Sequence, residues 1–168
     1  MRPERGEFIR AMRGVASSVS VVTTDGAAGR HGATVSAFCS VSADPPSVLI
    51  CLRADSRIAR CVVRNGVFCV NVLDAAATEV AERFAGRHDA GRRDRFAGLA
   101  IKPTGTAAPV LGAAASAFAC ELSETVPTGS HLVLIGRVSE VWYHDRQPLA
   151  YVDGGYASLS HPRAAGQR

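Results

Sequence analysis

The stretch Gly32–Leu52 constrains the fold of this chain more than any other. It reads GATVSAFCSVSADPPSVLICL, which predicts two strands joined by a turn at the double proline. Hydroxyl groups and small apolar groups alternate along the first strand. One parity holds Thr34, Ser36, Ser40 and Ser42 together with Phe38, and the other holds Ala33, Val35, Ala37, Cys39 and Val41. Because successive side chains in a strand point to opposite faces, we expect the Ala33/Val35 parity to pack into the core and the hydroxyl parity to face outward.

The rest of the chain predicts one mainly β domain over residues 1–160, with 161–168 as a disordered tail. The apolar patterns predict three short helices, at 4–15, 56–66 and 78–86, and further strands at 19–24, 67–73, 116–126 and 130–144. Gly136 lies within the last of these strands and suggests a bulge, and the segment 87–116 is expected to be mostly loop. Strands and helices do not alternate regularly, which favours an antiparallel barrel over a doubly wound parallel sheet.

Charge and composition exclude several classes of function. The net charge is +4, but the arginines near 87–95 are interleaved with Asp89 and Asp94, so we expect no nucleic-acid partner. No apolar run approaches the roughly 20 residues that cross a bilayer, and the N-terminal segment has no apolar core, so a cytoplasmic protein without a membrane partner is expected. The five cysteines have no C-x-x-C spacing, so we predict no metal site. We expect their thiols to be buried and the protein to occupy a reducing compartment.

The chain contains no set of residues that would perform chemistry by itself. Dinucleotide, P-loop and G-x-S-x-G motifs are absent, and the histidines at 31, 88, 131, 144 and 161 have no metal spacing. Such a chain is either a binding module or an enzyme whose cofactor performs the reaction.

Three features favour a cofactor, and each has a simpler interpretation. The hydroxyl face of 34–42 would suit a planar polar heterocycle, or it would be solvated or face another subunit. Leu52–Ser56 leads from a strand into a helix and would suit a phosphate, or Ser56 would simply cap the helix. The arginines of FAGRHDAGRRDRF, at 84–96, would suit an anion, or they would form a solvated basic loop.

Ordered blocks of sequence resemble a known family. From about residue 8 to 160 they are the opening stretch with Ser56, FCVNVL, ERFAG followed by DRF, PVLGAAASAFACEL, SHLVLIGRV and YVDGGY. Together they resemble the flavin reductase family, whose fold is an antiparallel Greek-key split barrel that binds FMN. These are the small reductase components of two-component flavin-dependent monooxygenases. One departure is Ser130, where the family often has an aspartate before the position of His131.

The resemblance implies a set of site residues. The flavin ring would lie against Thr34, Val35, Ser36 and Ala37, with Ala33 and Ser40 as further flavin contacts. The phosphate-bearing tail would reach Leu52, Arg53, Ala54, Asp55 and Ser56, and would pass Phe84, Ala85 and Gly86. The nicotinamide nucleotide would bind near His131 and the turn of Asp153, Gly154, Gly155 and Tyr156. No residue is assigned as an acid or base. His131 is the side chain expected to tune the nicotinamide site, unless it is only a polar residue at the start of a strand.

The implied reaction is hydride transfer from NADH or NADPH to N5 of FAD or FMN, with positioning of the two rings as the main contribution of the protein. The reduced flavin would pass to a separate monooxygenase in an aromatic-degradation or natural-product pathway, and the reductase would be a homodimer. Two alternatives share the flavin site. One is a non-catalytic carrier or sensor barrel, and the other is an FMN oxidase of the pyridoxamine-phosphate type, for which no additional phosphate cluster is evident.

Overall fold

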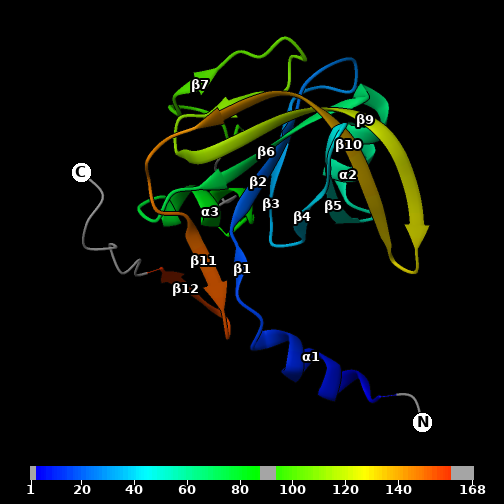
Figure 1. Cartoon of the computed structure of the whole chain (residues 1–168), viewed down its shortest axis with the longest axis vertical. Helices are drawn as coiled ribbons and strands as arrows, with labels where there is room; N and C mark the ends of the chain where they lie inside the picture. Colours follow the sequence, from blue (N-terminus) through cyan, green and yellow to red (C-terminus); the bar gives the residue numbers. More distant parts are fainter. Residues whose placement is uncertain (1–2, 88–93, 160–168) are drawn as a thin grey trace.

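The computed structural model describes residues 3–87 and 94–159 (Figure 1). The expected tail at 161–168 and most of the basic segment at 87–95 lie outside these residues. The helices are α1 (Arg5–Arg13), α2 (Arg57–Asn65) and α3 (Thr78–Phe84). The strands are β1 (Ser17–Ser18), β2 (Ser20–Thr24), β3 (His31–Val35), β4 (Phe38–Ala43), β5 (Pro46–Arg53), β6 (Val67–Leu73), β7 (Ile101–Lys102), β8 (Val110–Leu111), β9 (Ala114–Thr128), β10 (His131–Tyr143), β11 (Leu149–Val152) and β12 (Gly155–Ser158).

Seven antiparallel strands form the main sheet, in the order β3-β2-β6-β9-β10-β5-β4. Consecutive strands β3 and β4 are therefore the two edges of this sheet, and only two residues join them. The sheet must wrap around to bring its edges together, and its interior holds one apolar cluster that includes Ile50, Phe68 and Leu134. The expected mainly β, antiparallel fold is confirmed.

The break between β3 and β4 corrects the predicted single strand. At Ser36 and Ala37 the chain leaves β2 as its partner and joins β5, and the parity of the side chains shifts there by one residue. Ala33 and Val35 pack against the core as expected, but after the break Phe38 does so instead of Cys39. Cys39 and Val41 are exposed, so their expected place in the core was wrong.

Helix α2 closes one end of the barrel. Ile58, Ala59 and Val62 are buried in the same core as the sheet. The helix begins at the Ser56 cap, whose hydroxyl accepts a hydrogen bond from the Ala59 amide, and it ends at Gly66, whose φ of 70° is left-handed. Both predicted helix boundaries are confirmed. Because α2 begins directly after the Ser56 cap, only a short turn separates it from the end of β5.

Strands β9 and β10 form a long ribbon that arches over the barrel (Figure 1). Strand β9 extends from Ala114 to Thr128, beyond both ends of the predicted strand, because Ala114 pairs with Leu73 of β6 and Thr128 with His131 of β10. The predicted bulge is present, since the register of the two strands shifts between Ile135 and Gly136. The segment expected to be mostly loop also contributes the short pair β7–β8.

A second, three-stranded sheet has the order β1-β11-β12 and lies beside α3, while α1 projects from the body (Figure 1). Val19 links the two sheets, because its amide donates to Leu149 and its carbonyl accepts from Leu73. Among the described residues, no helix is long and apolar enough to span a membrane, and no group of His, Cys, Asp and Glu side chains is arranged to hold a metal ion.

Candidate functional site

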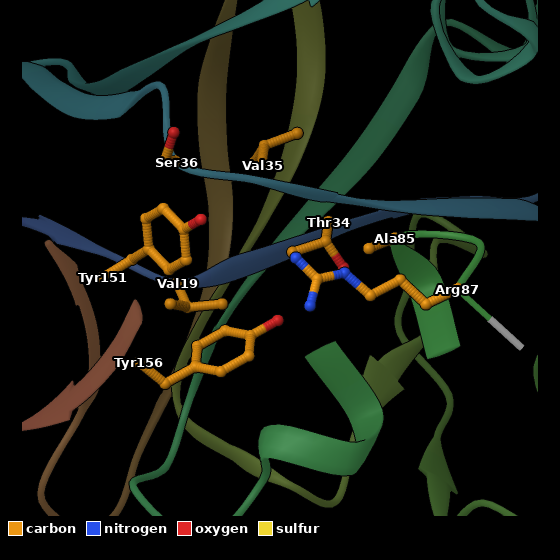
Figure 2. Close-up of a pocket in the computed structure, with 8 residues that line it drawn as sticks. All are labelled: Val19, Thr34, Val35, Ser36, Ala85, Arg87, Tyr151 and Tyr156. Atoms are coloured by element: carbon orange, nitrogen blue, oxygen red, sulfur yellow. The ribbon is translucent and has the colours of Figure 1, made fainter. Parts of the chain in front are cut away.

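A pocket of about 200 Å³ opens where β3 ends, between the two sheets and α3. Figure 2 shows its lining residues, which are Val19, Thr34, Val35, Ser36, Ala85, Arg87, Tyr151 and Tyr156. Five of them, Thr34, Val35, Ser36, Ala85 and Tyr156, are among the residues predicted for cofactor binding. The structure thus brings together residues from β3, the C-terminal end of α3 and β12, which are far apart in the sequence.

The β3–β4 break supplies free hydrogen-bonding groups at this pocket. The amide groups of Ser36 and Ala37 donate to no acceptor among the described residues, although the carbonyls of both residues accept, from Phe38 and Cys51. The Ser36 hydroxyl is also unpaired there and exposed. The Thr34 hydroxyl is different, because it donates to the carbonyl of Ala81 at 2.6 Å and so holds β3 against α3. A ligand acceptor group placed at this break would therefore meet donors that need no rearrangement.

Two tyrosines form one wall of the pocket. The rings of Tyr151 and Tyr156 pack edge to face, with centroids 5.5 Å apart. Burial raises the pKa of the Tyr156 phenol, and the nearby charge of Arg87 partly offsets this effect. The phenol therefore stays protonated at neutral pH and can act as a hydrogen-bond donor. Tyr151 was not predicted, because it comes from a strand whose place beside β3 depends on long-range pairing.

Arg87 brings the one fixed positive charge among the lining residues. Its guanidinium lies 3.4 Å from a carboxylate oxygen of Glu82, and in Figure 2 the hydroxyl of Tyr156 points toward it. The arginines of this segment were interpreted as an anion site in general, but the sequence did not single out Arg87. Its position follows from the end of α3, because the Arg87 side chain extends from there into the pocket (Figure 2).

Phe84 and Ala33, which were predicted to contact the flavin, direct their side chains elsewhere. Phe84 is buried and packs edge to face on Phe96 with centroids 5.0 Å apart. Its ring also lies directly against Gly32 of β3. Ala33 packs against the barrel core. Only their backbones can face a ligand. Gly86 follows Ala85 at the end of α3, and Ser40 is exposed on β4 beyond the pocket lining.

The turn at Leu52–Ser56 does not line the pocket, but it is one step along β5 from the strand break, since the Cys51 amide donates to Ala37. Arg53 and Asp55 form an exposed two-point ion pair with contacts of 2.8 and 3.1 Å. Their hydrogen bonds and mutual charge lower the pKa of the Asp55 carboxyl and raise that of Arg53. The Ser56 hydroxyl also donates to the Arg53 carbonyl at 2.6 Å, so a phosphate here would have to share it.

His131 and the 153–156 turn were expected to lie together, and within one chain they do not. His131 pairs with Arg53 across β10 and β5, and its Nδ1 lies 2.9 Å from the Ser130 hydroxyl, where the family often has a carboxylate. Asp153 and Gly154 instead form the turn between β11 and β12, next to α1. Figure 1 shows the start of β10 well apart from this turn. The reason is that β9 and β10 carry His131 out to the tip of their ribbon.

Comparison with known proteins identifies the family. The model of the flavin reductase like domain matches residues 12–160. The chain belongs to the flavin reductase family. It is similar to FMN reductase (NADH) RutF of Bradyrhizobium diazoefficiens, with 44% identity over 132 residues, covering 79% of this chain and 72% of the relative.

Solved flavin reductase structures also match along nearly the whole chain. NADH:FAD oxidoreductase SgcE6 of Streptomyces globisporus, solved with NAD and FAD fragments, has a TM-score of 0.86 and 27% identity, covering 96% of this chain and 95% of that one. The styrene monooxygenase flavin reductase of Pseudomonas putida has a TM-score of 0.81 and 28% identity, covering 92% and 98%. The family assignment makes this chain an oxidoreductase of the flavin reductase type.

The residues of the pocket fit a flavin. A flavin ring has an apolar edge and an edge with carbonyl and imide groups, and the pocket offers the matching chemistry. Val19 and the tyrosine rings supply apolar contacts, while the Ser36 amide and hydroxyl and the Arg87 guanidinium can donate hydrogen bonds to acceptors. In a flavin reductase the cofactor provides the reactive atoms, so the protein chiefly needs groups that bind and position the ring.

Proposed function

We propose that this chain catalyses the reduction of FMN or FAD by NADH at the β3–β4 break. The observation that carries the proposal is the strand break at Ser36 and Ala37, whose amides have no acceptor among the described residues, and where Ser36 lines a pocket together with two tyrosines and an arginine. When bound there, the flavin ring supplies the hydride acceptor. The protein contributes position, because hydride transfer requires two rings stacked at short distance and a fixed angle.

Each part of the site has a separate task in this proposal. The Ser36 and Ala37 amides and the Ser36 hydroxyl orient the ring, and the tyrosine wall excludes water from one side of it. The Leu52–Ser56 turn and the backbone at Phe84–Gly86 hold the phosphate-bearing tail, for which the Ser56 cap offers the free N–H groups of a helix start. The 153–156 turn receives the nicotinamide nucleotide.

We also assign His131 to the nicotinamide nucleotide. Because His131 lies well apart from the 153–156 turn of its own chain, it would reach a nucleotide held at this turn of the partner subunit in a homodimer. Its position beside Arg53 makes the assignment testable. The variant His131→Ala should raise the KM for NADH more than the KM for the flavin. A rise confined to the flavin KM would assign His131 to the flavin tail instead, since the 52–56 turn is its neighbour.

We further propose that the protein works as a cytoplasmic homodimer and delivers reduced flavin to a separate monooxygenase. The delivery is supported by the similar styrene monooxygenase flavin reductase, which is the reductase of a monooxygenase by its name. A dimer is supported by the outer face of β4, β5, β10 and β9. The strand registers place six apolar side chains there, namely Cys39, Leu49, Cys51, Val126, Val133 and Ile135. All five cysteines are free, which fits a reducing compartment.

A steady-state assay tests the reaction directly. The purified chain is mixed with NADH or NADPH and with FMN or FAD, and the loss of the nicotinamide absorbance is followed for all four pairs. We expect flavin-dependent oxidation of NADH, with turnover of added flavin. Tight retention of a yellow cofactor without turnover with any pair would instead identify a non-catalytic carrier, and oxidation of a phosphorylated amine would identify an oxidase of the pyridoxamine-phosphate type.

A further inference from the structure

A groove continues from the flavin pocket to the N-terminal helix. The pocket shares Ser36 and Tyr151 with a second hollow of about 550 Å³, which in turn shares Ile9 and Arg13 with a third of about 580 Å³. We call the second and third hollows together the α1 groove. One wall is α1, and the opposite wall is the turn at Asp153 and Gly154.

The α1 groove is apolar next to the pocket and cationic at its far end. Phe8, Ile9 and Met12 line the near part and are exposed by 60%, 41% and 50%, and α1 has no buried residue. Arg10 and Arg13 line the far part. An exposed apolar stripe beside two guanidinium groups is the pattern that suits an aromatic base attached to phosphates.

The far wall of the groove is held in place by Arg13. Its side chain forms an ion pair with the Asp153 carboxylate at 3.3 Å, and the Asp153 amide donates to the Arg13 carbonyl at 2.7 Å. Arg10 by contrast has no hydrogen bond or ion pair among the described residues, so its guanidinium is free to meet a ligand. Asp153 also adopts a left-handed φ of 47°, which folds the turn toward the helix.

We propose that the α1 groove binds the adenosine diphosphate moiety of the nicotinamide dinucleotide, with its phosphates at Arg10 and Arg13 and its apolar contacts along Ile9 and Met12. The proposal rests on the proposed function and adds α1 to the site. The co-substrate is favoured over the tail of FAD because the groove starts at Ser36 and Tyr151, on the mouth of the ring pocket. The flavin tail is assigned to the 52–56 turn, which lines neither hollow of the groove.

Titration calorimetry of the full chain with ADP-ribose tests this site without any turnover. The variant Arg10→Gln should raise the dissociation constant of ADP-ribose about fivefold to tenfold, as loss of one solvent-exposed hydrogen bond does. The FMN dissociation constant, measured by quenching of flavin fluorescence, should stay within twofold. Arg5→Gln is the matched control, because it removes the same charge from the same helix at a residue that lines neither hollow.

A second variant, Met12→Ser, tests the apolar part and should also weaken ADP-ribose without changing the association state in analytical ultracentrifugation. Four results would overturn the proposal. The first is a dissociation constant for ADP-ribose that Arg10→Gln leaves within twofold, and the second is an equal effect of Arg5→Gln. The third is weaker FAD binding by Arg10→Gln with unchanged ADP-ribose binding. A change of association state by Met12→Ser with unchanged ADP-ribose binding would show that a second copy covers the groove, and would also overturn it. Because ADP-ribose binding needs no flavin, a chain that fails to oxidise NADH but shows the Arg10 effect would reject the proposed function and keep the groove.

Discussion

The hydroxyl of Ser56 already makes two hydrogen bonds within the protein. It accepts from the Ala59 amide at 3.3 Å and donates to the Arg53 carbonyl at 2.6 Å. It therefore stabilises the start of α2 and shapes the turn that we assign to the flavin phosphate.

Replacing Ser56 with alanine should change both stability and binding. We expect the free energy of unfolding to fall by about 1 kcal/mol, the usual cost of a lost helix cap. If Ser56 also binds the phosphate, FMN should bind about fivefold more weakly, for the loss of one hydrogen bond. Urea unfolding and fluorescence quenching measure the two effects separately. Ser56→Thr, which keeps a hydroxyl, is the control, and an unchanged FMN affinity in Ser56→Ala would remove Ser56 from the site.

Two buried thiols make the protein sensitive to alkali. Burial raises the pKa of Cys69, and it raises the pKa of Cys120 to about 12, whereas an unfolded thiol ionises near 8.5. Above about pH 8.5 the unfolded chain loses these protons while the folded chain keeps them. The free energy of unfolding should therefore fall as pH rises, by about 1.4 kcal/mol per pH unit for each thiol.

Urea midpoints at pH 7.5 and 9.5 measure this dependence. The variant Cys120→Ala should flatten it by about one thiol, while Cys39→Ala should not, because Cys39 is exposed. An equal slope in the wild-type chain and in Cys120→Ala would contradict the prediction.

At the residue scale, local signals could be predicted and long-range ones could not. The Ser56 cap and the Gly66 end of α2 depend on hydrogen bonds within one turn of helix, so sequence alone reveals them. Arg87 and Tyr151 enter the pocket only through the packing of α3 and the pairing of β11, which no local pattern encodes.

At the scale of elements, the ribbon of β9 and β10 depends on a close approach at Gly136. A Cβ added there would lie 2.5 Å from Cζ of Phe68 and 2.8 Å from Cβ of Cys120, both in the core. Only glycine leaves room for these side chains at the bulge.

The variant Gly136→Ala should lower the free energy of unfolding by about 1–3 kcal/mol, because overpacking a dense core forces side chains or backbone to shift. Thermal or urea unfolding measures the loss. Gly6→Ala is the matched control, since a Cβ there would meet nothing within 4 Å. Equal stability of the two variants would show that the core around Phe68 adapts without cost.

The same scale explains where the strand prediction failed. A period of two reports which side chains share a face, but it does not report which strand becomes the partner. The pattern through Val35 and Cys39 reads as continuous, yet the chain changes partners between them and the parity shifts. Thr34, Val35 and Ser36 of the predicted site line the pocket because they lie directly before or at this break.

At the scale of the whole molecule, the outer apolar face of β4, β5, β10 and β9 is the surface that we assign to the homodimer. Val126 lies on this face and is 43% exposed. Val126→Asp should convert a dimer into monomers, because burying an unpaired carboxylate in an interface is costly.

Analytical ultracentrifugation measures this change. Val63 is also 43% exposed but lies on α2, away from the face, so Val63→Asp should leave the association state unaltered. Loss of the dimer in both variants, or in neither, would remove this face from the interface.

The two-residue link at Ser36 and Ala37 has a consequence for motion in the entire barrel. It joins the two strands that have only one neighbour each in the seven-stranded sheet, so β3 and β4 are where this sheet can open. A flavin bound at the link would tie these edges together, and at a concentration 100 times its dissociation constant it would add about 2.7 kcal/mol against opening. Amide hydrogen exchange should then slow about 100-fold in β3 and β4, while the pair β7–β8, which is not part of this sheet, keeps its rate. The reductase would in that case release its product by parting the two edges of its own sheet.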